Sequence, residues 1–479
     1  MKITRSLLAA GAALAVLGGT AVTAGATINS PLLNRVARGD LSQPGGAARL
    51  NGDETGTIRS AIQDAGAKNV ILIIGDGMGD SEITSGRNYL EGAGGAFSGL
   101  DALPMTGQMT HYSLYKDGKP DYTPDSAATG SAWATGTKTY DNAISVDIHG
   151  KPQQTLLQLA KAGGRATGNV STAEIQDATP AVQVANINLR KCYGPKVTSA
   201  ECPDFAKENG GPGSITEQLL DTRPDVTLGG GAKTFSETAT AGVFKGKTLE
   251  QQAKERGFQY LTDPNALAGV RRVDQKSPLL GLFNDSNLPV KFAPLVATPD
   301  GATKAPQRCT DNPDYTSAPS LKLMTSKATE LLSQTKDGHR NGFFLQVESA
   351  SIDKKDHAAD ACGQIGEMSQ LNDAVDEALK FARRDGNTLV LVTADHAHTS
   401  QIVDAGTPGL NANLLTADGS PMLLSYNTAA AAGSQQHTGT QVRVAGFGPG
   451  AANVVGLVDQ TDLFGIINNG MAAYGRKPR

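Results

Sequence analysis

The stretch TPDSAATGSAWATG, residues 123–136, places one acid and one serine at the start of a run of small side chains. Asp125 and Ser126 are both residue types that cap helices, because their side-chain oxygens accept hydrogen bonds from free backbone N–H groups. The same N–H groups and the helix dipole would also stabilise an anion bound there. The stretch therefore predicts a helix capped by Asp125 and Ser126, and it allows Ser126 to be a nucleophile at the helix N-terminus as well. The two interpretations are compatible, and other segments of the chain must decide.

Acidic side chains follow three apolar segments at the point where each segment ends. Asp76 follows NVILIIG, and Glu348 follows FFLQV. Asp395 and His396 follow LVLVTA. The carboxyl ends of parallel strands meet at one edge of a sheet, where open α/β sheets bind their ligands. A single acid there is commonplace, but three acids in one place would repel one another unless cations neutralised them, so the pattern predicts bound metal.

Histidines at metal-binding spacings extend this predicted site. His357 follows Asp353 by four residues, which lets both side chains reach one ion from a single helical turn. His437 stands just before the last apolar segment, whose backbone would hold it at the sheet edge. Imidazole with carboxylate suits zinc, whereas Glu348, with hydroxyls and no nearby nitrogen, suits magnesium. His398 is expected to orient a metal ligand instead of binding the metal itself.

The remaining histidines and a glycine-rich segment have other interpretations. The remaining histidines are expected to be ordinary surface residues: His111, His149 and His339. The glycine-rich segment IIGDGMGDS lacks the spacing of dinucleotide-binding and P-loop motifs, and its Asp76 would repel a pyrophosphate. Its small residues are instead expected to let the backbone crowd around that acid.

Apolar segments without polar alternation recur along the chain, as is typical of strands buried on both faces. They are residues 69–76, 166–171, 225–230, 342–348, 387–395 and 441–448. Helix-like segments lie between them, at residues 153–164, 214–223, 318–334 and 366–386. We therefore predict a three-layer α/β sandwich, in which helices cover both faces of a largely parallel central sheet and the metal cluster lies at the carboxyl ends of the strands.

The chain of 479 residues is predicted to be one large domain behind an export signal. Residues 1–26 carry two cations before a short apolar run and end in Ala-Gly-Ala, which is typical of a secretory signal peptide. Residues 27–60 are interpreted as an exposed arm, and residues 61–479 as the catalytic domain. Within that domain, residues 232–320 are expected to be an irregular excursion. The mature protein is expected to be periplasmic or secreted, without a membrane span.

Four cysteines in an exported chain indicate disulfides, because the compartment is oxidising and none of them belongs to a Cys-x-x-Cys pair. Three pairings are open, and the most local one joins Cys192 to Cys202 and Cys309 to Cys362; it is the one we expect. The formal net charge of −4 gives no indication of a nucleic-acid partner.

Taken in order, the motifs resemble those of the bacterial secreted alkaline phosphatases. The similar segments run from about residue 60 to about residue 465: IIGDGMGDSEIT, PDSAATGSAWATG, NVSTAEIQDATPA, RKCYGP, FFLQVESASIDKKDHAA, VTADHAH and QQHTGTQVRVAGFGPGAANV. The four cysteines also fall where that family has two local disulfides. The resemblance implies a homodimer that uses the N-terminal arm and hydrolyses phosphate monoesters through a covalent phosphoserine.

The resemblance further implies a role for each matching residue. Ser126 matches the nucleophile, Arg190 the guanidinium that grips two phosphate oxygens, and Lys354 a cation near the phosphate. Two zinc ions would have these ligands: Asp353, His357 and His437 for one, and Asp76, Asp395 and His396, with the Ser126 oxygen, for the other. One magnesium ion would have these ligands: Asp76, Thr179 and Glu348, with Asp177 contacting it directly or through water. Lys354 and Asp177 are expected to pair.

The chemistry of the residues agrees with these roles. A serine hydroxyl is a poor nucleophile at neutral pH, and the sequence shows no histidine beside Ser126, so bound zinc would have to stabilise the alkoxide. The alternatives are a phosphodiesterase or sulfatase on the same metal scaffold, or a non-catalytic binder of phosphate or zinc. A sulfatase would have Pro and Arg in place of Ala128 and Gly130. A diesterase would more often have threonine as its nucleophile, and a binder would have no need of Ser126.

Overall fold

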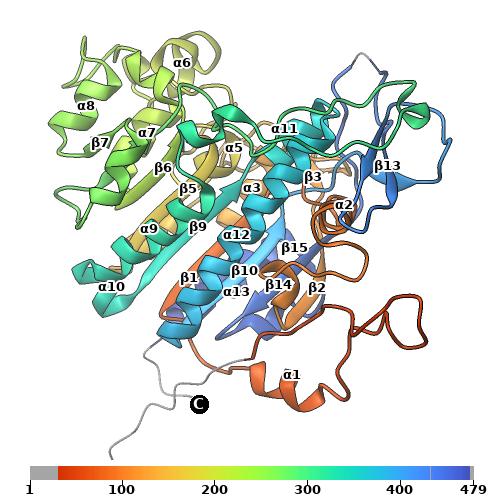
Figure 1. Cartoon of the computed structure of the whole chain (residues 1–479). Coiled ribbons are helices and arrows are strands. Elements are labelled where there is room, and N and C mark those ends of the chain that lie inside the picture. Colours follow the sequence, from red (N-terminus) through yellow and green to blue (C-terminus); the bar gives the residue numbers. More distant parts are fainter. Residues whose placement is uncertain (1–30, 432, 475–479) are drawn as a thin grey trace, which may run out of the picture.

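The computed structural model of the chain describes residues 31–431 and 433–474 (Figure 1). The predicted signal peptide, residues 1–26, lies outside these residues. None of the helices within the described ranges is both long and apolar enough to cross a membrane.

A ten-stranded sheet forms the centre of the molecule. In spatial order its strands are β15 (Gly456–Asp459), β2 (Met105–Thr110), β14 (Val442–Phe447), β10 (Thr388–Ala394), β1 (Asn69–Gly75), β9 (Phe343–Ser349), β5 (Ala166–Glu174), β6 (Val226–Gly230), β8 (Leu279–Leu282) and β7 (Gln259–Leu261). Every neighbouring pair is parallel except the pairs that β14 forms with β10 and β2. The six strands expected from the sequence are all present, and the predicted largely parallel sheet is confirmed.

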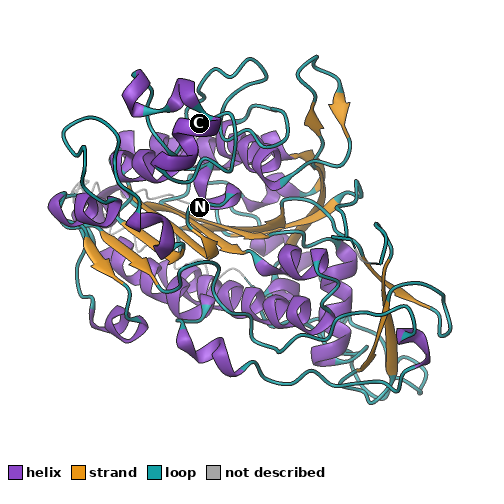
Figure 2. Ribbon diagram, turned by 90° about the horizontal axis from the view of Figure 1, so that it is seen from above, coloured by secondary structure: helices purple, strands orange, loops and turns teal. Residues whose placement is uncertain are grey.

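Helices cover both faces of this sheet, so the molecule has three layers (Figure 2). One helical layer contains α2 (Asp80–Glu91), α9 (Leu321–Gln334) and α12 (Ala361–Asp385). The opposite layer contains α3 (Ser126–Thr135), α4 (Leu156–Ala162) and α13 (Gln460–Ala473). Every residue of β1, β9 and β10 is buried, because helices cover both faces of these apolar strands.

Shorter elements surround this core. The other helices are α1 (Thr55–Ala61), α5 (Ala178–Ala181), α6 (Pro195–Glu201), α7 (Ile215–Thr222), α8 (Leu249–Glu255), α10 (Lys336–Asn341) and α11 (Ser351–His357). A small antiparallel sheet contains β11 (Ser400–Val403), β13 (Pro421–Tyr426) and β12 (Asn411–Leu415). A short hairpin contains β3 (Ser113–Leu114) and β4 (Pro120–Asp121).

Residues 232–320 are more regular than the sequence indicated. They contain α8, and their strands β8 and β7 extend the main sheet beyond β6 in parallel register. These strands have only four and three residues, LLGL and QYL, so no apolar run is long enough to reveal them. The expectation that 441–448 forms the last strand is also wrong, since β15 follows it and pairs with β2.

The described part of the predicted arm, residues 31–60, lies at one end of the molecule and includes most of α1 (Figure 1). Backbone hydrogen bonds attach it to the body, from Leu33 to Ala102 and from Ala37 to Gly94. Both expected disulfides, Cys192–Cys202 and Cys309–Cys362, are present.

Candidate metal centre and active site

The carboxyl ends of β9, β1 and β10 bring the predicted acids together. β1 lies between the other two strands, and its last residue, Gly75, pairs with Ser349 on one side and Ala394 on the other. Asp76, Glu348 and Asp395 therefore end up at the same edge, and each is at most 2% exposed. The predicted position of the acid cluster is confirmed.

Acids and histidines form two groups. Within each group, the candidate ligand atoms all lie within 4.8 Å of one another. One group is Asp76, Asp395 and His396, and the other is Asp353, His357, His398 and His437. The groups bring together all six residues that the sequence assigned to two zinc ions, and they add His398. The loop after β1 allows this crowding, because a Cβ on Gly77, whose φ is +69°, would lie 3.1 Å from Cα of Asp353.

His398 belongs to the second group through its contact with an acid. Its Nδ1 accepts a hydrogen bond from the backbone N–H of Thr399 at 2.8 Å, so the neutral ring carries its proton on Nε2. That nitrogen lies 3.0 Å from Oδ1 of Asp353. A protonated ring nitrogen cannot bind a metal, so this arrangement favours the predicted orienting role.

The buried polar atoms at this edge fit bound cations. Oδ2 of Asp395 and Oγ1 of Thr179 have no hydrogen-bond partner among the described residues. Burying such atoms without a partner costs free energy, which a coordinated cation would offset. Imidazole nitrogens with carboxylate oxygens are the donor set of zinc sites.

Burial also sets the charge state of these groups. Burial and the nearby Asp353 and Asp395 raise the pKa of Asp76 well above its ordinary range. Burial raises the pKa of Asp395 to about 6 and that of Glu348 to about 8. Burial lowers the pKa of His396 well below its ordinary value, so this imidazole stays neutral. Neutral imidazoles and deprotonated carboxylates are the forms that bind metal.

Ser126 is the first residue of α3, and Asp125 precedes it as the N-cap. The Asp125 carboxylate accepts the N–H of Ala128 at 3.0 Å, so Asp125 caps the helix and the expectation that Ser126 also caps it is wrong. Oγ of Ser126 instead lies 3.4 Å from both Oδ1 of Asp76 and Nε2 of His396. The hydroxyl thus faces one of the two metal-binding groups.

Asp177 links the two cations that were expected near the phosphate. Its Oδ1 accepts hydrogen bonds from Arg190 and from the hydroxyl of Tyr193, both at 2.9 Å. Its Oδ2 lies 2.7 Å from Nζ of Lys354, so the expected pairing of Lys354 with Asp177 is confirmed. Burial alone would raise the pKa of Asp177, but Lys354 and Arg190 lower it below its ordinary value. A second donor of Arg190 contacts Asp125 at 3.0 Å.

The residues expected around magnesium lie close to this pair of cations. Glu348 accepts a hydrogen bond from the hydroxyl of Ser171, and burial raises the pKa of Glu348 although the nearby Lys354 partly opposes this rise. Thr179 lies in α5, whose N-cap is Asp177. Among the described residues, neither of the two groups of clustered acids and histidines includes Glu348 or Asp177.

Two residues differ from what the sequence suggested. Tyr193 was not expected at the site, although it stands three residues after Arg190; burial and Asp177 raise its pKa well above the ordinary value, which keeps its hydroxyl protonated. His111 is buried, not at the surface, and its Nε2 lies 2.6 Å from the carbonyl oxygen of Thr440. His149 and His339 are exposed, as expected.

The hydroxyl, the cations and one metal-binding group open into a single cavity of about 500 Å³. Its lining includes Ser126, Arg190, Asp353, Lys354, His357 and His437. The rest of the wall is polar: Thr123, Asp125, Asp141, Asn142, Lys191 and Gln436. A small anion in this cavity would meet a nucleophile, fixed cations and metal ligands at once.

Comparison with known proteins points to one family. Residues 67–427 match the family model described as alkaline phosphatase. An alkaline phosphatase of Escherichia coli (strain K12) is 59% identical over 451 residues, which cover 93% of this chain and 95% of that protein. Alkaline phosphatase H of Pseudomonas aeruginosa is 58% identical over 457 residues, covering 94% and 95%. The solved alkaline phosphatase from the Antarctic bacterium TAB5 shares the fold, with a TM-score of 0.61 at 24% identity over 86% of this chain and 99% of that one.

Proposed function

The chain belongs to the alkaline phosphatase family and is a metal-dependent hydrolase of phosphate monoesters, and we propose that its reaction passes through a phosphoserine at Ser126. The observation that carries this proposal is the position of Oγ of Ser126, which lies 3.4 Å from two atoms of a metal-binding group and lines the same cavity as Arg190. The phosphodiesterase, the sulfatase and the non-catalytic binder are not favoured.

The residues of the chain divide the reaction between them. Oγ of Ser126 attacks phosphorus, the bond from phosphorus to the ester oxygen breaks, and the alcohol leaves with a proton. Water then cleaves the phosphoserine, which releases inorganic phosphate and restores the hydroxyl. Asp125 and Asp177 each hold one terminal nitrogen of Arg190, so the guanidinium is oriented to grip two phosphoryl oxygens through its remaining donors.

Three metal ions complete the proposed site. We assign one zinc to Asp353, His357 and His437, and a second to Asp76, Asp395 and His396. We assign one magnesium to Asp76, Thr179 and Glu348, with Asp177 contacting it directly or through water. Bound ions of this kind supply Lewis-acid stabilisation of negative oxygen. His398 then orients Asp353, and Lys354 adds positive charge next to the phosphate.

Family membership also supports an organisation for the whole chain. We propose that residues 1–26 are a signal peptide, that residues 27–60 form an arm used in a homodimer, and that residues 61–479 are the catalytic domain. The two disulfides support export to the periplasm or the medium, because an oxidising compartment maintains such bonds.

Turnover of an aryl phosphate before and after metal removal tests this function. We expect dialysis against a chelator to abolish monoesterase activity and zinc with magnesium to restore it. The reason is that the acids and histidines clustered at one edge of the sheet are placed there to bind cations. Circular dichroism would verify that the metal-free protein stays folded, and an aryl sulfate and a diaryl phosphate serve as comparison substrates. Full activity after verified metal removal, or faster turnover of either comparison substrate, would refute the proposal.

A further inference from the structure

We propose that Tyr193 is a positioning residue for phosphate binding. Its hydroxyl holds the Asp177 carboxylate in the orientation that presents Arg190 and Lys354 to the phosphate. Tyr193 itself does not line the cavity, so it acts only through Asp177. The inference rests on the proposed roles of Arg190 and Lys354.

The contacts of Asp177 show why the phenol matters. Three donors converge on its Oδ1 at 2.9 Å: the backbone N–H of Ala178, the guanidinium of Arg190 and the hydroxyl of Tyr193. Lys354 approaches the other oxygen at 2.7 Å. Arginine and lysine side chains are long and rotate about several bonds, whereas a tyrosine ring rotates about only two. Among the described residues, the phenol is therefore the one rigid side-chain donor to this carboxylate.

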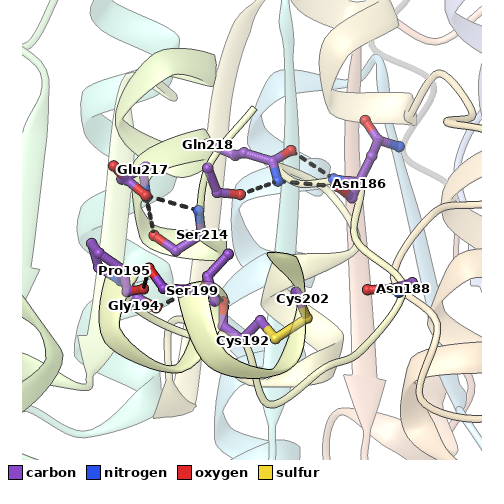
Figure 3. Close-up of a disulfide and its surroundings, with 12 residues drawn as sticks. Asn186, Asn188, Cys192, Gly194, Pro195, Ser199, Cys202, Ser214, Glu217 and Gln218 are labelled. Atoms are coloured by element: carbon purple, nitrogen blue, oxygen red, sulfur yellow. Dashed lines mark hydrogen bonds between the residues drawn. A yellow bond between two sulfur atoms is a disulfide. The ribbon is translucent and has the colours of Figure 1, made fainter. Parts of the chain in front are cut away.

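The backbone of Tyr193 is fixed by the start of α7. Its carbonyl oxygen accepts hydrogen bonds from the backbone N–H of Thr216 at 3.0 Å and from the Thr216 hydroxyl at 2.8 Å. The preceding carbonyl, on Cys192, accepts the N–H of Ile215 at 3.0 Å. The disulfide from Cys192 to Cys202 lies against this segment (Figure 3). The phenol hydroxyl is thus carried by backbone that has little freedom to shift.

The other end of the same segment is also attached to α7. The side-chain amide of Gln218 donates to the carbonyl of Asn186 at 3.0 Å and accepts the N–H of Asn186 at 2.9 Å (Figure 3). Ser214 and Glu217 form the capping box that begins this helix. The segment that carries Arg190 is therefore clamped to α7 on both sides, and α7 itself contributes neither a metal ligand nor a cavity residue.

Replacement of the phenol hydroxyl alone tests this role. A positioning contact of this kind strengthens binding of substrate and product phosphate about equally. In Tyr193→Phe we expect KM and the inhibition constant of inorganic phosphate to rise together, by about threefold to tenfold, while kcat stays within about twofold. Zinc and magnesium content, measured on the same sample, should equal that of the parent. In Thr216→Val, which removes a donor to the Tyr193 carbonyl, both constants should move in the same direction by less.

The matched control is Tyr140→Phe. The Tyr140 hydroxyl donates to the carbonyl of Asn188 at 3.4 Å, so it touches the same segment without touching Asp177, and both constants should stay unchanged. The inference is overturned if Tyr193→Phe leaves both constants unchanged or if it loses metal. Arg190→Ala separates this failure from failure of the proposed function: phosphate inhibition that survives Arg190→Ala refutes the role of Arg190 itself.

Discussion

The hydroxyl of Ser126 lies 3.4 Å from two atoms of a metal-binding group, and Ser126 lines the cavity. Because this hydroxyl is the proposed nucleophile, Ser126→Ala should lower kcat/KM for an aryl phosphate by about 10³-fold or more. Ser131→Ala is the matched control on the same helix, since its hydroxyl bonds only to backbone and should affect stability instead of turnover. Initial rates at saturating metal measure both. Comparable losses in the two variants would mean that Ser126 matters only for folding.

Substitution of Lys354 tests the role of the cations near the phosphate. Lys354 pairs with Asp177 and adds charge near a phosphate dianion, an interaction that holds substrate and product about equally. Lys354→Ala should therefore weaken inhibition by inorganic phosphate and leave kcat unchanged or raised at alkaline pH, because product release often limits turnover. Steady-state inhibition and turnover measurements decide the matter. If phosphate inhibits the variant as strongly as the parent, Lys354 does not belong to the site.

The sequence predicted the place of site residues at strand ends. It did not predict contacts between residues that lie far apart in the chain. Asp76 and Asp395 each follow a buried strand, and Glu348 is the last residue but one of β9, so the edge of the sheet where they meet is fixed by topology. No local pattern shows that His396 comes within 3.4 Å of Ser126, because 270 residues separate them. Tyr193 was missed because its partner, Asp177, lies 16 residues away and no local pattern pairs the two.

The loop between β1 and α2 is the element that lets two metal-binding groups approach. A Cβ on Gly77 would lie 3.0 Å from the ring of His398 and 3.1 Å from Asp353. Gly77→Ala should therefore lower metal content and activity together, as measured by elemental analysis and aryl phosphate turnover. Gly118→Ala is matched to it, because Gly118 has φ of +84° with open space around it and should cost only about 1 kcal/mol of stability. If Gly77→Ala and Gly118→Ala lowered metal content and activity equally, the loss at Gly77 would be due to backbone strain alone.

The length of a helix or strand decided whether it could be predicted from the sequence. Every long apolar strand and each of the four expected helices is present, including α12, which extends five residues before the expected start at 366. Strands β7 and β8 were missed because a run of three or four residues carries no period. β8 pairs with β6 and β7 pairs with β8, so their place in the sheet depends on contacts between segments that lie apart in the sequence.

At the scale of the whole molecule, titratable groups gather at the edge of the sheet where the metal-binding groups lie. The free energy of unfolding of the metal-free protein should therefore depend on pH. Groups whose pKa is raised by folding contribute stability that is lost as pH rises through the folded value. Glu348, whose pKa burial raises to about 8, and His437, whose pKa burial alone would lower but Asp353 raises to about 9, are two such groups. His396 and His398, whose pKa values are lowered, have already lost their protons at pH 7.

We therefore expect the free energy of unfolding of the chelated protein to fall from pH 7 to pH 9. With zinc and magnesium bound, the ions neutralise these groups and the decrease should be much smaller. Urea unfolding at both pH values, with and without metal, measures the difference. Identical pH dependence in the two forms would show that these residues do not hold the ions.

Isolation of the phosphorylated protein tests the central claim most directly. The enzyme would be mixed with labelled inorganic phosphate or an aryl phosphate, quenched in acid and digested, and its phosphopeptides sequenced by mass spectrometry. The position of Ser126 predicts stoichiometric, acid-stable phosphate on the peptide that contains it, and no label in Ser126→Ala. Stoichiometric phosphate on any other residue, or label that persists in Ser126→Ala, would contradict it.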